Sequence, residues 1–297
     1  MMREIGDIVR AFERRPGEPF ALATLVSSRG SSYRRPGARM LIARDGQTAG
    51  SLSGGCLEDE VVEKAREVLR TGAATTMEFD TRRRFGCHGA IEIFVERADE
   101  MFLAELAKNF HARRSITVAT SFEKGTRIVR DAVPADAFVQ TIEPPLQLLV
   151  VGDGPDSAAL HLIAGALGWR VIDIAHASEL GGPFDQWTAA IVKTHNYGRD
   201  CAALRALFPL GLPYIGLLGP RRRRDQLLGD LADSGLEMCP NLFAPAGLDL
   251  GGDSPEVIAL AIVAEIQAVL ADGSRHSLRE RRAPIHAKPD GELIAAD

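Results

Sequence analysis

The chain has 297 residues, of which 45% are hydrophobic and 25% are charged, and its formal net charge is -5. These values are typical of a globular protein of about two domains, and they argue against nucleic acid or an anionic membrane as the main partner. No apolar run is long enough to span a bilayer, and the charged N-terminus is unlike a signal peptide, so we expect a cytoplasmic protein.

Residues 1–143 are predicted to form a small α+β domain. The expected elements are a helix that stops before Pro16, strands at 20–27 and 38–43, a helix after Cys56, strands at 75–79 and 89–96, a helix at 101–110 and a hairpin around Gly125. The loop at 28–40 carries Arg34 and Arg35 among glycines and hydroxyls. Such a loop is either a solvated turn or an anion cradle, because guanidinium groups and free backbone N–H groups both suit phosphate.

Two cysteines of this domain lie beside glycines. Gly54 and Gly55 precede Cys56, which stands at the start of a predicted helix, where the helix dipole favours a thiolate. The alternative is a small buried residue that fills space under the turn. Cys87, with His88, lies between two further glycines just before a strand. Two such cysteines in one small domain predict a shared site for a soft ligand or cofactor. The spacing of the four cysteines gives no sign of a disulfide framework or a closed zinc site.

Residues 144–273 are predicted to form a Rossmann-like domain with a parallel sheet. Residues 147–174 have the pattern of a strand, a glycine turn, a helix and a second strand. Gly152 and Gly154 at the turn indicate a nucleotide or phosphorylated cofactor. Ser157 replaces the third glycine of the dinucleotide pattern, and Ala175 stands where an acidic ribose ligand is expected. Ordinary NAD(P) binding is therefore not favoured.

The later strands supply further candidates. A buried strand ends at Thr194 and His195, and because such strand ends line the ligand crevice, His195 either contacts a ligand or caps the next helix. Four arginines, residues 221–224, begin another helix, where positive charge needs a compensating partner. Arg221 and Arg222 are predicted to contact phosphate or a partner protein. Ser254 is expected to cap a long apolar helix packed on the first domain or a second subunit. Residues 274–297 are predicted to be a mobile tail.

Several stretches resemble one family in order along nearly the whole chain. They are GSSYRRPGARMLI, GSLSGGCLEDEV, FGCHGAIEIFVE, VVGDGP, VKTHNYGRD, PYIGLLGPRRRR and GLDLGGDSPEVIALAIVAEI. They are similar to the XdhC/CoxI family of accessory proteins for xanthine dehydrogenase and related molybdenum hydroxylases. The chain departs from the family's usual residues at His88, Pro155, Ala175 and Pro220, which bears on the ligand contacts of the Rossmann-like half.

The resemblance implies a chaperone and not an enzyme. Such a protein binds molybdenum cofactor (molybdopterin or its nucleotide form), protects the sulfurated form and inserts it into an apo molybdenum hydroxylase, with a cysteine desulfurase as a second partner. We expect a homodimer that binds no nucleic acid or membrane. The candidate cofactor-binding residues are Cys56, Cys87, Arg34, Arg35, Gly54, Gly55, Gly152, Gly154, His195, Arg221 and Arg222, with Cys56 and Cys87 as possible molybdenum contacts.

Two other functions stay open on the residues alone. The glycine turn suggests an NAD(P)-binding oxidoreductase, against which Ser157 and Ala175 argue. A nucleotidyl transfer enzyme acting on the pterin is the second, and its only acidic pair near the glycine turn is Asp153 and Asp156.

Overall fold

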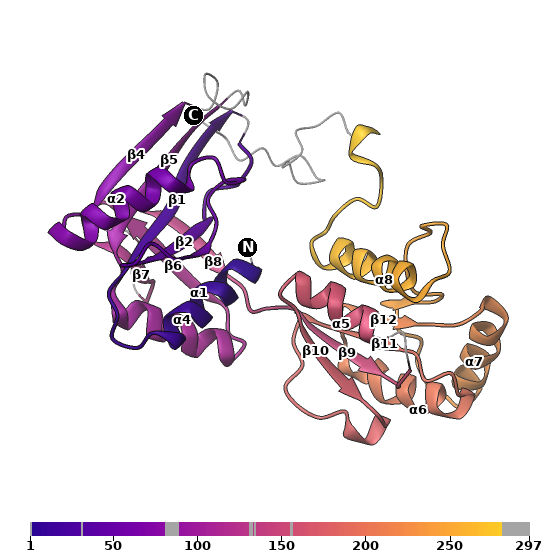
Figure 1. Cartoon of the computed structure of the whole chain (residues 1–297). Helices are drawn as coiled ribbons and strands as arrows, with labels where there is room; N and C mark the ends of the chain where they lie inside the picture. The colour runs from indigo at the N-terminus through magenta and orange to yellow at the C-terminus, as the bar shows by residue number, and fades with distance from the viewer. Residues whose placement is uncertain are drawn as a thin grey trace. The chain divides into compact units, whose positions relative to one another are not determined.

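A computed structural model describes residues 2–30, 32–80, 89–130, 133, 135–154 and 157–280. The chain divides into two compact units, Met1–Pro145 and Leu146–Asp297 (Figure 1). Cys87 and His88 lie outside the described residues, as do Pro155, Asp156 and most of the predicted tail. No helix among the described residues is both long and apolar enough to cross a membrane.

The first unit is built around a five-stranded antiparallel sheet of order β3-β2-β1-β5-β4, and a second sheet has the order β7-β6-β8. Its elements are α1 (Met2–Arg14), β1 (Phe20–Gly30), β2 (Arg39–Ala43), β3 (Thr48–Gly50), α2 (Glu58–Thr71), β4 (Thr75–Asp80), β5 (Gly89–Arg97), α4 (Glu100–His111), β6 (Ile116–Ser121), β7 (Gly125–Ile128) and β8 (Phe138–Ile142).

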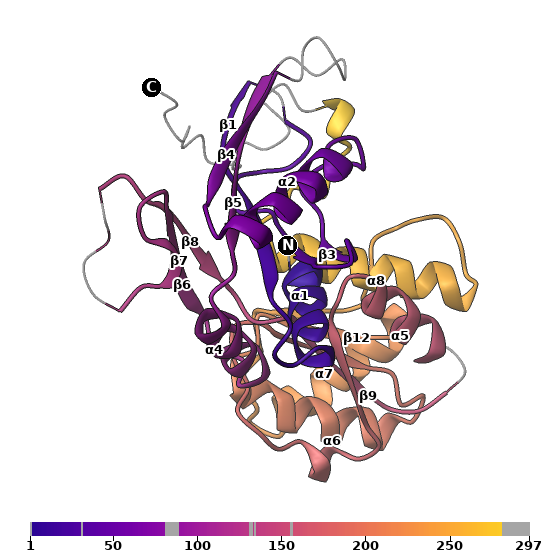
Figure 2. The same cartoon turned by 60° about the vertical axis from the view of Figure 1, so that its left-hand side comes forward.

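Alternation along β1 explains how helices cover both faces of the larger sheet. Ala21, Ala23 and Leu25 pack with the buried side of α2, whereas Phe20 and Leu22 pack with α1 and α4. Successive side chains of a strand point to opposite faces, so α2 and α1 lie on opposite sides of the sheet. Figure 2 shows α2 running along β1 and β5.

The second unit is a five-stranded parallel sheet of order β10-β9-β11-β12-β13. Its elements are β9 (Gln147–Val151), α5 (Ser157–Ala166), β10 (Arg170–Ile174), η1 (Ala177–Glu179), β11 (Thr188–Val192), α6 (Tyr197–Leu207), η2 (Phe208–Leu210), β12 (Tyr214–Leu217), α7 (Arg221–Asp233), β13 (Leu242–Phe243), α8 (Pro255–Leu270) and η3 (Leu278–Glu280).

Helices α5 and α8 lie on one side of this sheet and α6 and α7 on the other (Figure 1). The strand order reverses beside β9, because the chain leaves β9 for β10 on one side and later returns to β11 on the other. In open parallel sheets, ligands bind at the carboxyl ends of the strands at such a reversal. The predicted α/β class, with a Rossmann-like parallel sheet and a smaller N-terminal α+β region, is confirmed.

Candidate functional site

The candidate residues fall into two groups, one in each unit. In the first unit, the loop between β3 and α2 is organised by the carboxylate of Glu58. This carboxylate accepts hydrogen bonds from the Ser53 amide at 2.9 Å, the Ser53 hydroxyl at 2.5 Å and the Leu57 amide at 3.1 Å. Longer bonds of 3.3 Å come from the Ser51 hydroxyl and the Leu52 amide. One acidic side chain therefore holds most of the loop in place.

Ionisation of Glu58 is part of this arrangement. Burial opposes the charged form, but the hydrogen bonds from Ser53 and Leu57 outweigh it and hold the pKa of Glu58 below its ordinary value. The Ser53 hydroxyl in turn accepts the amides of Gly55 and Cys56, both at 3.2 Å. The loop is thus fixed by hydrogen bonds that need an ionised carboxylate.

The Cys56 thiol is exposed at the tip of this loop, so the interpretation of Cys56 as a buried space-filling residue is wrong. Its Sγ lies 3.5 Å from the Ser53 hydroxyl oxygen. Beside the loop, the ring of Tyr33 lies next to Gly54, and Tyr33 is 71% exposed. A free thiol, two glycines and an open aromatic ring therefore share one surface.

The arginines of the 28–40 loop have different surroundings. Arg34 forms an ion pair with Glu4 of α1, whereas Arg35 is exposed. Binding of a cofactor by Arg34 would have to compete with Glu4. The second predicted thiol, Cys87, lies outside the described residues, so its distance from Cys56 is not defined.

In the second unit, the glycine turn after β9 touches the chain that follows β11. A Cβ on Gly152 would lie 2.7 Å from the Thr194 Cα and 2.8 Å from the Lys193 carbonyl carbon. Gly152 also has a φ of 113°, which L side chains rarely adopt. Only glycine fits this position without displacing backbone.

The side chain of Lys193 links the same two segments by hydrogen bonds. It is 1% exposed, and its ammonium donates to the Asp153 carbonyl at 3.2 Å and to the Ser157 hydroxyl at 2.9 Å. Ser157 opens α5, so the serine that replaces the third glycine serves as a hydrogen-bond partner for a buried lysine. A positive charge therefore lies where a dinucleotide fold presents its helix N-terminus to phosphate.

The strand end after β11 is held by a buried ion pair. Asp200 is fully buried, accepts the Thr194 amide at 3.3 Å and the Thr194 hydroxyl, and pairs with Arg223 at 2.5 Å. His195 follows with a φ of 54° and is exposed. Asn196 caps α6 by accepting the Arg199 amide at 3.0 Å, so the capping role considered for His195 is wrong.

A hollow of about 300 Å³ lies at the carboxyl ends of β9 and β10. Its lining includes Ala175, His176 and Arg199, and the Arg199 guanidinium donates to the Ala175 carbonyl at 2.7 Å. This hollow therefore has a guanidinium beside the position where dinucleotide folds carry a ribose-binding carboxylate. Arg221 and Arg222 are exposed at the start of α7, where Arg223 and Arg224 are partly buried in ion pairs.

Sequence reasoning missed Glu58, Tyr33, Lys193 and Arg199 as organising residues. A lysine at the end of the otherwise apolar strand AAIVKTH was a usable signal for Lys193. Glu58 and Arg199 have ordinary helix positions, and nothing in the sequence distinguishes them. Among the described residues, no three His, Cys, Asp or Glu side chains are grouped so that they could hold a metal ion.

Together these features define a two-unit α/β protein with a braced, exposed thiol in one unit and a Rossmann-type crevice in the other. A family model described as "XdhC and CoxI family" matches residues 13–80, and one described as "XdhC Rossmann domain" matches residues 148–266. The two matches cover well over half of the chain. The chain belongs to the XdhC/CoxI family.

Named relatives agree with this assignment. The chain is 28% identical to a Bacillus subtilis protein named as a probable xanthine dehydrogenase subunit, over 84% of this chain and 92% of the relative. It is 26% identical to "Molybdenum cofactor insertion chaperone PaoD" of Escherichia coli, over 85% of this chain and 84% of the relative. A crystal structure described as a xanthine dehydrogenase from Bacillus halodurans has the same fold, with a TM-score of 0.77 at 23% identity over 91% of this chain and 98% of that one.

Proposed function

We propose that this chain binds molybdenum cofactor, protects its sulfurated form and inserts it into an apo molybdenum hydroxylase of the xanthine dehydrogenase type. Family membership and the names of the relatives support an accessory role in the maturation of such enzymes. The observation that carries the proposal is the exposed Cys56 thiol on a loop fixed by Glu58.

The chemistry of Cys56 suits a molybdenum-containing cargo. Thiolates are soft ligands, and a single protein ligand leaves the rest of the coordination to the cargo, which favours later transfer. Hydrogen bonds within the chain already fix this loop, so binding of the cofactor costs little conformational entropy. The open ring of Tyr33 offers a face on which a flat pterin can stack.

The second unit is proposed to bind an anionic part of the cofactor. Gly154, His195 and Arg221 lie at the carboxyl edge of its sheet. Arg199 lines the hollow there and pairs with Asp153 at 3.7 Å. Arg222 is proposed to contact the cofactor or the hydroxylase. A cysteine desulfurase and a second copy of this chain are the further partners that we propose.

Purification from a host that makes molybdenum cofactor tests this function. The wild-type chain should retain pterin and molybdenum, and Cys56→Ser should lower both by at least about tenfold, the equivalent of about 1.4 kcal/mol. Cys201→Ser is the matched control, because Cys201 is partly buried in α6 and burial raises the pKa of its thiol. A Cys56→Ala, Cys87→Ala double variant shows whether the second thiol adds to binding.

Two results would overturn the proposal. One is undiminished pterin and molybdenum in the double variant. The other is oxidation of a substrate by the isolated chain. Titration with NADH, followed by its fluorescence, separates the chaperone from an NAD(P)-binding oxidoreductase, because only the oxidoreductase should show saturable binding and turnover.

A further inference from the structure

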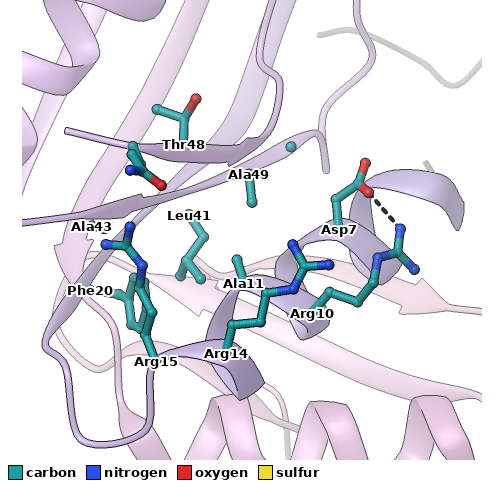
Figure 3. Close-up of a pocket in the computed structure, with 12 residues that line it drawn as sticks. Asp7, Arg10, Ala11, Arg14, Arg15, Phe20, Leu41, Ala43, Thr48 and Ala49 are labelled. Atoms are coloured by element: carbon teal, nitrogen blue, oxygen red, sulfur yellow. Dashed lines mark hydrogen bonds and ion pairs between the residues drawn. The ribbon is translucent and has the colours of Figure 1, made fainter. Parts of the chain in front are cut away.

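A second hollow, in the first unit, is lined by arginines that the proposed function does not use. It lies between α1 and the strands β2 and β3 and has a volume of about 330 Å³ (Figure 3). We call it the α1–β3 hollow. Small-molecule sites in proteins begin at about this size.

The floor of the α1–β3 hollow is apolar. Phe20 is 3% exposed, Leu41 1% and Ala43 3%, and Ala11 and Ala49 complete this surface. Gln47 and Thr48 add neutral polar groups on the strand side. The side chains of Phe20, Leu41 and Ala43 are already almost fully covered, so a flat ligand body laid against them would gain little from apolar burial. The specific contacts of a ligand here would come from the polar groups at the rim.

Three arginines line the hollow: Arg10 and Arg14 of α1, and Arg15, which follows the helix. Figure 3 shows the Arg15 side chain beside Phe20 and Ala43, apart from those of Arg10 and Arg14. Asp7 also lines the hollow, but it pairs with Arg10 at 2.6 Å, so its charge is offset. Within the described residues, the structure gives Arg14 no carboxylate partner. The lining therefore has an excess of positive charge.

Arg15 would have to exchange existing partners to bind a ligand. It pairs with Asp45 at 3.0 Å and with Glu18 at 3.3 Å, outside the lining of the hollow. Asp45 is 48% exposed, so solvent weakens its pair with Arg15, whereas Arg15 and Glu18 are each 28% exposed. A phosphate can replace these carboxylates as a charge-assisted acceptor for Arg15, and it can bind Arg14 without breaking an ion pair of Arg14 among the described residues.

We infer that the α1–β3 hollow binds a phosphate monoester with a compact, flat organic body, through Arg14 and Arg15. This chemistry is shared by a nucleoside monophosphate and by the phosphorylated pterin of the cofactor. The site goes beyond the proposed function, because it involves neither the thiol loop nor the parallel sheet.

The test uses the full chain freed of cofactor, at low salt, with cytidine 5′-monophosphate, cytidine and inorganic phosphate as calorimetric probes. We expect saturable binding of the monophosphate, weaker binding of phosphate and no binding of cytidine. Arg14→Gln with Arg15→Gln should raise the dissociation constant of the monophosphate at least about tenfold. Lys64→Gln with Arg70→Gln makes the same charge change on α2, which packs on the opposite face of the sheet, and should leave binding unchanged.

Cofactor retention by the Arg14, Arg15 variant then identifies the source of the phosphate. Retention that falls together with monophosphate binding assigns the hollow to the cofactor's phosphate, and retention that persists assigns it to a separate nucleotide. The inference is overturned if the monophosphate shows no saturable binding, or if both double variants bind it alike. In that case the arginines only complement the C-terminal dipole of α1, and the Cys56 test is unaffected.

Discussion

Removing the charge of Asp200 should destabilise the second unit. In the wild type, the Asp200 carboxylate accepts hydrogen bonds from Thr194 and Arg223. Asp200→Asn replaces one of its two oxygens with an NH2 group, so one of these donors then faces another donor. Breaking a fully buried ion pair costs about 3–5 kcal/mol. Because Arg223 is 26% exposed and keeps part of its hydration, we expect about 2–3 kcal/mol here.

The chain offers a probe that reports this unit alone. Its two tryptophans, Trp169 and Trp187, both lie in the second unit, so their fluorescence follows the unfolding of that unit in urea. With a urea dependence of about 2 kcal/mol per molar, the midpoint should fall by about 1–1.5 M. Asp233→Asn, the same change at an exposed position of α7, should leave the midpoint within about 0.25 M.

A double-mutant cycle separates the ion pair from other effects of the substitution. Arg223→Met alone should also destabilise strongly, because it leaves the buried carboxylate uncompensated. The combined variant should lose at least about 1 kcal/mol less than the sum of the two single changes. Additive losses, or a loss below about 0.5 kcal/mol for Asp200→Asn, would refute this account of the strand end.

Three further changes follow from the same structure. Glu58→Gln should lower the free energy of unfolding by about 1–2 kcal/mol and expose residues 51–57 to limited proteolysis. Because the pKa of Glu58 is lowered in the folded chain, its contribution to stability is complete near pH 7 and disappears as the pH falls below about 4. The stabilities of the wild type and the variant should converge there. Gly152→Ala should lower the free energy of unfolding, followed by tryptophan fluorescence, by at least about 2 kcal/mol, because the new Cβ meets the backbone of Thr194. Gly165→Ala in α5 is the control: its Cβ enters open space, and it should raise the free energy of unfolding by about 0.5–1 kcal/mol. His195→Gly should stabilise the folded state by up to about 1 kcal/mol, because glycine adopts the same left-handed conformation without the steric cost of a Cβ. If His195 contacts the cofactor, the variant should also retain less cofactor; equal stability would argue against strain at this position.

The fold could be predicted because it is encoded locally. A nearly continuous apolar run in β1 and an apolar run followed by glycines in β9 specify their elements without knowledge of distant residues. Ser254 and Pro255 likewise marked the start of α8, where the Ser254 hydroxyl accepts the Val257 amide at 3.4 Å. The family assignment followed from several such stretches in order and is confirmed by both family models.

The arrangement of the sites could not be predicted, because it depends on contacts between distant residues. Four adjacent arginines at α7 gave no indication that Arg223 would pair with Asp200, 23 residues earlier. Arg34 similarly meets Glu4 across 30 residues. The predicted binding roles of Arg221, Arg222 and the glycines stay predictions until cofactor retention is measured.

The glycine turn itself now has a reason that does not involve a ligand. Glycines between a first strand and helix are usually explained by close approach of phosphate. In this chain, the backbone that approaches Gly152 is that of Lys193 and Thr194, and the Lys193 ammonium is bound to the carbonyl of Asp153 and the hydroxyl of Ser157. Gly152 would therefore be required even if the crevice held nothing. Evidence for a nucleotide in this unit must come instead from Arg221 and Arg222, which are exposed, and from Ala175 and His176 in the lining of the hollow. Substitutions at these positions bear on ligand binding more directly than changes to the turn.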